Sequence, residues 1–530
     1  MGTAPKGSND QVNWSRVKTQ VQEANPDLQD ALDVSAVIES LGWTDRRIEE
    51  TFGYPDVFSM AQDLYDELHR DVTSKPLPIE VRISRQKLIF SIIRDVGHGL
   101  TFTLPMVVSV MAMITLHITF SSYQYFSVSN ATAIALATFL SFLTTGGFSQ
   151  AMTNVYYILL GMQKTGEIEA AVFQLLRWGL WMTLGTCGAL LIIDFIFPIM
   201  PFHLIGLMIL YTIMLSALWL SFTGLYILRR EYFLTVITAI AIGVAYVLYH
   251  HGIAVQWAQA VAMLVASLLS LSTSLVIFRR RTKGLKTLPG LFKTRMPQLL
   301  HTASPYFLYG VLYFVFIYTD RLVAWSSQTT FLPYNIWFRG QYELGMDWSL
   351  IALFLPLSLA EVLISSIMRQ LEHLEHRTAL IHTSQLFQKL RWKYAWSLGF
   401  FVLSSVVGVI FAHFAVSFLA PTRLFHTSVP VLGVEPFVFA WSSWSYVLFS
   451  VALFNVLLLF TLSYPRPALK VLGYGVLTDV VSGIAATQIL NGYQFAVLGL
   501  FASAIVMAVY SSGLVLGLLP RTDYLLFRLT

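Results

Sequence analysis

The chain has 530 residues, of which 56% are hydrophobic and only 12% charged, and its mean hydropathy is +0.64. This balance excludes a soluble globular protein and is typical of a polytopic membrane protein. The net charge of +5 does not indicate a nucleic-acid partner, because the basic residues gather in loops, where membrane topology accounts for them. The single cysteine, Cys187, excludes a disulfide framework and a cysteine metal cluster.

Residues 1–93 have ordinary charge density and contain no run of membrane-spanning length. They predict a soluble cytoplasmic head with three short helices: one over 33–40, one capped by Thr44 and ended by Gly53, and one that Pro55 opens. The pattern fits a regulatory or docking module, and it fits equally a small cap that packs on the membrane part. DNA binding is disfavoured, because acidic residues stand beside the basic ones in the second helix.

The third helix of the head is expected to bury one apolar face, formed by Phe58, Ala61, Leu64 and Leu68. The basic, proline-containing segment 72–95 then predicts a linker that ends in an interfacial helix. The N-terminus has no apolar core of a secretory signal, so the first spanning helix is expected to direct membrane insertion.

Beyond the linker, the sequence contains about twelve apolar runs, each close to the roughly 20 residues that cross the hydrocarbon core. They lie near 97–120, 130–160, 173–197, 203–227, 232–250, 254–278, 300–325, 347–368, 394–419, 437–463, 471–490 and 495–518. Basic residues collect in alternate loops, and only Arg339 and Arg423 fall in the loops between. Because Lys and Arg remain on the cytoplasmic side, both termini are predicted to be cytoplasmic.

The runs form two similar sets of six. The first run of each set has an early proline, Pro105 or Pro305, and the second run continues into a charged end. We therefore predict an all-α membrane protein of two pseudo-symmetric six-helix bundles, with a substrate path between them and alternating access by rocking. The predicted parts are the head with its linker (1–93), the first bundle (94–278), a basic hinge loop (279–298), the second bundle (299–520) and a tail (521–530).

Charged residues inside spanning helices are costly, so each is a candidate for a substrate or ion pathway. Asp320 and Arg321 lie toward the outer end of the seventh run. Neighbours on a helix do not face each other, so each needs its own partner or water; the alternative is a pair that only anchors the helix end. Glu361 lies among apolar residues in the eighth run, and Asp479 lies near the middle of the eleventh.

The second run is polar without being charged, and Gln150 and Asn154 on it are further candidates for the pathway. Such a polar face either joins helices by hydrogen bonds or lines a wet cavity. The sequence contains no GxxxxGK[ST] loop, no metal-ligand spacing and no nucleophile elbow. We therefore expect neither an enzyme nor an ATP-driven pump, and no catalytic residue, metal or cofactor.

The twelve runs, their division into two sets and the basic central loop resemble the MOP superfamily, which includes MATE drug exporters and polysaccharide flippases. The segment PYFLYGVLYFVFIYTDRLVAW at 305–325 is similar to the seventh helix of the PelG family of exopolysaccharide transporters, with Asp320, Arg321 and Trp325 at the matching positions. Two features depart from the superfamily pattern. The soluble head is additional, and the first run lacks the acid that many MATE exporters use for cation coupling.

The resemblance implies a flippase or exporter of the bacterial inner membrane that moves a polysaccharide or a lipid-linked saccharide. Arg321 would meet anionic or hydroxylated groups of the cargo, and Asp320, Glu361 and Asp479 would serve substrate binding or cation coupling. The implied partners are the saccharide, the lipid bilayer and, through the head, other proteins of exopolysaccharide synthesis or secretion.

The sequence leaves two other functions open. A MATE-like, cation-coupled multidrug antiporter would have the same fold and a different cargo. A membrane sensor or scaffold would use the head as its output and transport nothing. A membrane glycosyltransferase is less favoured, because the predicted outer loops offer only Glu343, Asp347 and Glu435 as acids.

Overall fold

A computed structural model provides the structure of the chain. It describes residues 14, 17–21, 31–74, 104–113, 115–162, 164–282, 296–330, 332–353, 356, 359–360, 362–364, 366–367, 383–419, 433–462 and 464–519. The regular structure of these residues is helical, apart from an isolated β-bridge between Ile118 and Tyr123. The chain divides into two compact units, Met1–Ser91 and Ile92–Thr530, and each is described here by itself.

The first unit, which corresponds to the predicted head, has a small apolar core of its own. Its helices are α2 (Ala31–Ser40), α3 (Asp45–Phe52) and α4 (Val57–Ser74), close to the three predicted ones. Gly53 ends α3 with a φ of 74°, a left-handed conformation that costs glycine little because it has no Cβ. Thr44 holds the N-cap position of α3, but its side chain makes no capping hydrogen bond.

The prediction of the buried face of α4 is wrong at its first residue, Phe58. Ala61, Leu64 and Leu68 are buried as expected, whereas Phe58 is 56% exposed and Val57 is buried in its place. Val57 lies four residues before Ala61 and therefore on the same face, while Phe58 is rotated by about 100° from it. A hydrogen bond from the Val57 backbone N–H to the carboxylate of Asp45 (2.8 Å) fixes this start of the helix.

Asp56 caps α4, since its Oδ1 accepts hydrogen bonds from the Ser59 backbone N–H (2.7 Å) and hydroxyl (2.8 Å). These bonds, the backbone one first, lower the pKa of Asp56 from its usual 3.8. A lowered pKa in the folded state stabilises the head above the unfolded value, and this stabilisation is lost as pH falls through the folded value. We expect Asp56→Ala to lower the melting temperature of a 1–91 fragment by a few degrees at neutral pH. The difference from wild type should vanish in acid, as circular dichroism melts across pH would show.

The second unit contains, in the part of the chain that the structure describes, ten helices long and apolar enough to cross a membrane. Those of the first half are α6 (Val128–Gly161), α7 (Thr165–Ile196), α8 (Phe202–Ile227), α9 (Glu231–His250) and α10 (Val255–Thr282). Those of the second half are α11 (Met296–Ser326), α14 (Thr383–Leu419), α15 (Val434–Thr461), α16 (Pro465–Ile489) and α17 (Val497–Leu518). The chain is a multi-pass membrane protein.

The remaining two predicted runs are described only in part. The run at 97–120 contains a short apolar helix, Leu104–Met113. The run at 347–368 begins inside α12 (Gly340–Leu350), which a 3₁₀ turn, η1 (Ile351–Leu353), follows. A second 3₁₀ turn, η3 (Tyr493–Ala496), precedes α17. α10 and α11 also extend into the predicted basic loop 279–298 from both sides, so that only thirteen residues separate Thr282 from Met296.

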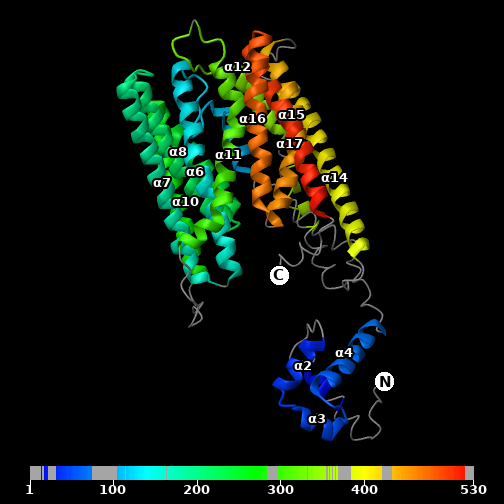
Figure 1. Cartoon of the computed structure of the whole chain (residues 1–530). Coiled ribbons are helices and arrows are strands. Elements are labelled where there is room, and N and C mark those ends of the chain that lie inside the picture. Colours follow the sequence, from blue (N-terminus) through cyan, green and yellow to red (C-terminus); the bar gives the residue numbers. More distant parts are fainter. Residues whose placement is uncertain are drawn as a thin grey trace. The chain divides into compact units, whose positions relative to one another are not determined.

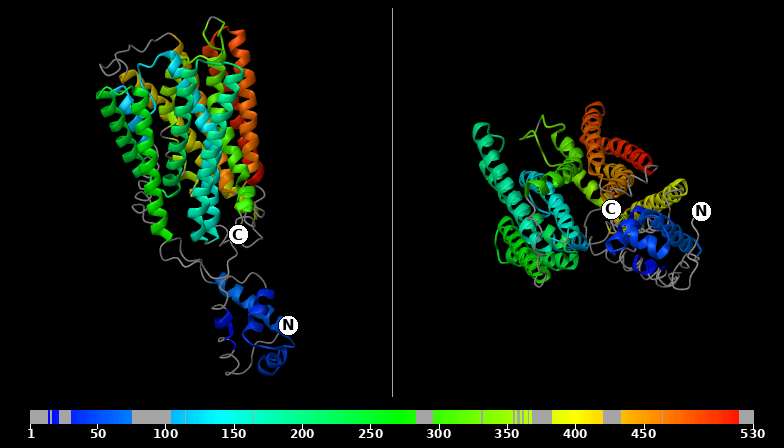
Figure 2. Two further views of the ribbon diagram at one scale, coloured as in Figure 1. Left: turned by 90° about the vertical axis from the view of Figure 1, so that its left-hand side faces the viewer. Right: turned by 60° about the horizontal axis from the view of Figure 1, so that its bottom comes forward.

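The helices of the membrane unit form two groups, cyan to green for the first half and green to red for the second (Figures 1 and 2). In the first group, α6 packs on α7 and α8, and α10 packs on α8 and α9. In the second, α11 packs on α16, and α15 and α16 both pack on α17. Because α6 also packs on α11, these two helices form the seam between the two bundles.

The seam depends on close approach of two helix backbones. A Cβ atom on Gly310 of α11 would overlap the carbonyl oxygen of Gly146 of α6, and one on Gly146 would overlap the ring of Phe314. The rings of Phe142 and Phe314 stack beside this crossing, with centroids 4.4 Å apart. Helices in lipid associate by van der Waals packing, for which small residues allow the closest approach. The glycines therefore set the distance between the two bundles.

The polar face of α6 serves mainly to join helices within the first bundle. The Thr183 hydroxyl of α7 donates a hydrogen bond to Thr144 (3.2 Å), and the Thr223 hydroxyl of α8 donates to Ser149 (2.9 Å). Thr144 and Thr183 are both buried. Of the two roles expected for this face, hydrogen bonding between helices is the one seen at these positions.

Candidate functional site

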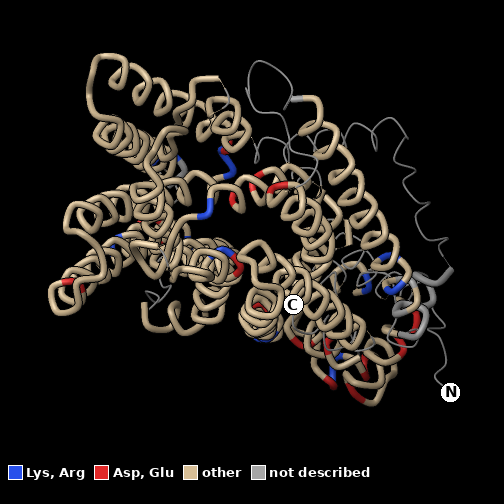
Figure 3. Tube along the Cα trace, turned by 90° about the horizontal axis from the view of Figure 1, so that it is seen from above, with Lys and Arg blue, Asp and Glu red and all other residues tan. Residues whose placement is uncertain are grey.

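Charged residues are few along the helices of the membrane unit (Figure 3). Two of them, Asp320 and Arg321, lie near the C-terminal end of α11, and each has its own partner on α12. The Tyr342 hydroxyl donates to Asp320 Oδ2 (2.7 Å), and Arg321 Nε donates to Glu343 Oε2 (2.8 Å). Asp320 is 0% and Arg321 6% exposed. The structure thus supplies the separate partners that adjacent helical residues require.

Glu343 receives a second hydrogen bond, from Trp325 Nε1 to Oε1 (2.9 Å). Arg321 and Trp325, one turn apart on α11, therefore bind the two oxygens of a single carboxylate. A second acid of α12, Asp347, lies 3.8 Å from Arg321 Nη2 but is 66% exposed at its side chain. The guanidinium also lies 5.5 Å from the ring centre of Tyr318, a distance that allows a cation–π contact.

Sequence reasoning missed the partners on α12, because it placed Glu343 and Asp347 in an outer loop. That placement is wrong: α12 begins at Gly340, and both acids are helical. Their charges lower the local hydropathy, so the predicted run began only at residue 347. The usable signal was their spacing of four, which places two acids on one helix face and so calls for a nearby cation.

Asp479 lies on α16, and its residue is 0% exposed. It stands within electrostatic range of Asp320 on the neighbouring α11. Among the described residues, neither of its carboxyl oxygens has a hydrogen-bond partner, and the same holds for Asp320 Oδ1. α17 passes very close, since a Cβ atom on Gly499 would lie 2.7 Å from Asp479 Oδ1. The structure therefore brings Asp320, Arg321 and Asp479 into one buried cluster.

Gln150 and Asn154 lie elsewhere, one turn apart on α6. Gln150 packs against the seam, its Cγ 2.9 Å from the position of a Cβ on Gly310. Asn154 Oδ1 is buried and has no hydrogen-bond partner within the described part of the chain. Gly310 precedes Asp320 by ten residues, or about 15 Å along the helix, so these amides do not join the buried cluster. The remaining candidate, Glu361, lies outside the described residues.

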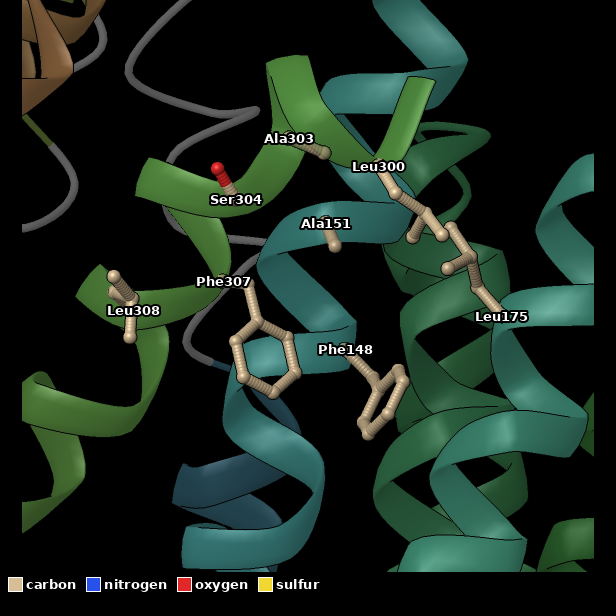
Figure 4. A pocket seen from close by; sticks show the side chains of 8 residues that line it. All are labelled: Phe148, Ala151, Leu175, Leu300, Ala303, Ser304, Phe307 and Leu308. Carbon is tan, nitrogen blue, oxygen red and sulfur yellow. The ribbon is translucent and has the colours of Figure 1, made fainter. Parts of the chain in front are cut away.

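An apolar pocket of about 350 Å³ lies at the seam, near the N-terminal end of α11 (Figure 4). Its lining comes from α6, α7 and α11: Phe148, Ala151, Leu175, Leu300, Ala303, Ser304, Phe307 and Leu308. Pro305 lies beside it and has no N–H to donate to the carbonyl of His301. The Ser304 hydroxyl donates to that carbonyl instead (2.7 Å), so the proline leaves no unpaired backbone group there.

The chain has the fold of the MOP-superfamily transporters, which confirms the predicted fold class. It is similar to a MATE protein in complex with MaD5, with a TM-score of 0.55 and 13% identity over 81% of this chain and 95% of that one. It is similar to a MOP-superfamily transporter from Pyrococcus furiosus, with a TM-score of 0.55 and 15% identity over 80% and 96%. For the MATE transporter VcmN of Vibrio cholerae, in a mutant form, these values are 0.53, 13%, 82% and 99%. No protein-family model and no curated protein sequence matches the chain.

Proposed function

We propose that this chain is a flippase or exporter that moves a polysaccharide or a lipid-linked saccharide between its two bundles by alternating access. The observation that carries the proposal is the environment of Arg321, whose guanidinium lies 5.5 Å from the ring centre of Tyr318 and donates to the carboxylate that Trp325 also binds. Arg321 is 6% exposed, so cargo would reach it when α12 moves away from α11. A guanidinium donates to hydroxyl and anionic groups, and aromatic faces stack on sugar rings. The fold, shared with MOP-superfamily transporters, supports transport as the activity.

The acids of the cluster also favour this cargo over an organic cation. Arg321 neutralises Glu343 and adjoins Asp320 in sequence, so these two acids offer an organic cation little uncompensated negative charge. Asp347 is the exception, because its side chain is 66% exposed. That single accessible carboxylate is the observation that favours the second candidate, a MATE-like antiporter of amphipathic cations.

The other predicted site residues would act at other positions along the path. Gln150 and Asn154 would line the path at the level of the seam, and Glu361, in the predicted run 347–368, would serve substrate or cation coupling. The protein would lie in a bacterial inner membrane with both termini in the cytoplasm. The head would there contact other proteins of exopolysaccharide synthesis or secretion.

Secreted exopolysaccharide is the measurement that tests this function. In a strain that lacks the gene, we expect secretion to be lost and to return with the wild-type gene on a plasmid. A variant reduced to residues 92–530 should restore part of the secretion, since the bundles alone form the path; a sensor or scaffold that works through the head would restore none. Normal secretion in the deletion strain, together with raised sensitivity to cationic dyes, would favour the antiporter.

A further inference from the structure

Asp479 is the one acid of the buried cluster that the interactions described above leave unexplained. We infer that Asp479 is a proton-binding site: its carboxyl holds a proton at neutral pH in this conformation and releases it when α16 moves away from α11 and α17. Asp479 is 0% exposed, and its two carboxyl oxygens have no hydrogen-bond partner among the described residues.

Ionisation of Asp479 in this position would be very unfavourable. An ionised carboxylate away from water needs a cation or several hydrogen-bond donors, and a buried acid that has neither binds a proton instead. Within the described part of the chain, no Lys, Arg or His pairs with Asp479. Its protonated form, in contrast, leaves only a neutral carboxyl group to bury.

The neighbouring acid, Asp320, differs from Asp479 in having partners. Asp320 accepts a hydrogen bond from Tyr342 and adjoins Arg321 in sequence, so its carboxylate, unlike that of Asp479, has a hydrogen-bond donor and a neighbouring cation. Two acids that repel each other do not readily ionise together, so a charge on Asp320 further favours a proton on Asp479. The titratable or charged groups that face the two acids from α11, α12 and α15 are Arg321, Tyr342, Glu343 and Tyr446.

A proton suits this site better than a metal cation. Hard cations such as Ca²⁺ and Mg²⁺ take about six or more oxygen ligands. The described residues contain no group of three or more His, Cys, Asp or Glu side chains that could hold a metal ion. The acid within electrostatic range of Asp479 is Asp320, and the Tyr342 hydroxyl already donates to Asp320.

Because α17 packs closely on Asp479, binding of the proton depends on how the helices are arranged. Gly499 packs against the carboxyl and both carboxyl oxygens are buried, so water does not reach Asp479 in this arrangement. Release of the proton therefore requires that the helices separate, and by linkage the bound proton favours the closed arrangement. That this movement drives cargo export rests on the proposed function, whereas proton binding itself does not. The site lies in the second bundle, in a chain whose first predicted run contains no acid.

Infrared spectroscopy of the purified full-length protein tests the site without any cargo. A protonated carboxyl group has a C=O stretch distinct from that of a carboxylate, and the probe is the proton itself, varied by pH. We expect a protonated-carboxyl band at neutral pH that disappears at alkaline pH. Asp479→Asn should remove the band, and Asp320→Asn should keep it. Asp194→Asn, at the end of α7, where Asp194 accepts from the Ile199 N–H, is the matched control and should also keep it.

A band that survives in Asp479→Asn would overturn the inference. So would the loss of the band in wild type on addition of sodium chloride, but not choline chloride, at constant pH, because the site would then bind Na⁺. Asparagine matches aspartate in shape, and an unchanged melting temperature of Asp479→Asn would show that loss of the band is not unfolding. If the band behaves as expected while exopolysaccharide secretion is normal in the deletion strain, the proton site stands and only the proposed cargo falls.

Discussion

Glu343→Ala is expected to destabilise the second bundle by about 3–5 kcal/mol, the usual cost of removing one partner of a buried ion pair. Arg321 and Glu343 have side-chain exposures of only 7% and 13%, so water cannot replace the lost carboxylate. The Trp325 N–H would lose its acceptor as well. The measurement is thermal unfolding of the purified protein in detergent, followed by size-exclusion chromatography of the heated samples.

Two further variants test whether the buried ion pair is the cause of this loss of stability. Asp347→Ala removes an acid that is 66% exposed, and the loss should stay below about 1 kcal/mol. Arg321→Met combined with Glu343→Leu replaces the pair by apolar groups of similar size, and most of the lost stability should return. Secretion should remain absent in this double variant if the guanidinium binds cargo. A double variant that secretes normally would show that the pair serves only the fold.

Gly310→Ala is expected to disrupt the seam, although it adds only one methyl group. The new Cβ would overlap the carbonyl oxygen of Gly146, which belongs to a helix backbone and cannot rotate away as a side chain could. Overpacking typically costs about 1–3 kcal/mol, and we expect the upper part of that range or more. Under the proposed alternating access, separation of α6 from α11 would also change how the bundles move, and secretion should then fall further than the loss of stability predicts.

Gly206→Ala on α8 and Gly243→Ala on α9 are the matched controls for this change. A Cβ at either position has no atom within 4 Å, so both variants should unfold at the wild-type temperature or slightly above it. Equal behaviour of Gly310→Ala and these controls in thermal unfolding and in secretion would contradict the role of the seam.

The fold could be predicted from the sequence largely because a membrane-spanning helix is recognisable as a run of about 20 apolar residues. Ten apolar runs of sufficient length became ten spanning helices among the described residues, and no tertiary information was needed to find them. The eighth run was misplaced at its start for a physical reason. Hydropathy counts the cost of Glu343 and Asp347 but not their pairing with Arg321, which lies 22 residues away from Glu343.

Of the candidate site, the charged residues within the apolar runs could be predicted from the sequence, but their partners could not. The cost of a charge in a membrane singled out Asp320, Arg321 and Asp479, and the structure brings them together. Their partners Tyr342 and Glu343 depend on how α12 lies against α11, which no local pattern encodes. Gln150 and Asn154 are polar like the residues of the site, but they lie at a different level along the helix axes. Composition alone does not give that position.

The apolar pocket beside Pro305 has a lining suited to the acyl chain of a lipid. Its lining is almost entirely carbon, and Leu308 at its edge is 51% exposed. An apolar pocket that opens toward lipid would fill with acyl chains in preference to water. A chain lodged there would lie between α6, α7 and α11, where the proposed alternating access requires the two bundles to shift against each other. The length and saturation of the membrane's fatty acids would then set how freely the halves move, and the choice of detergent would decide how active the purified protein is.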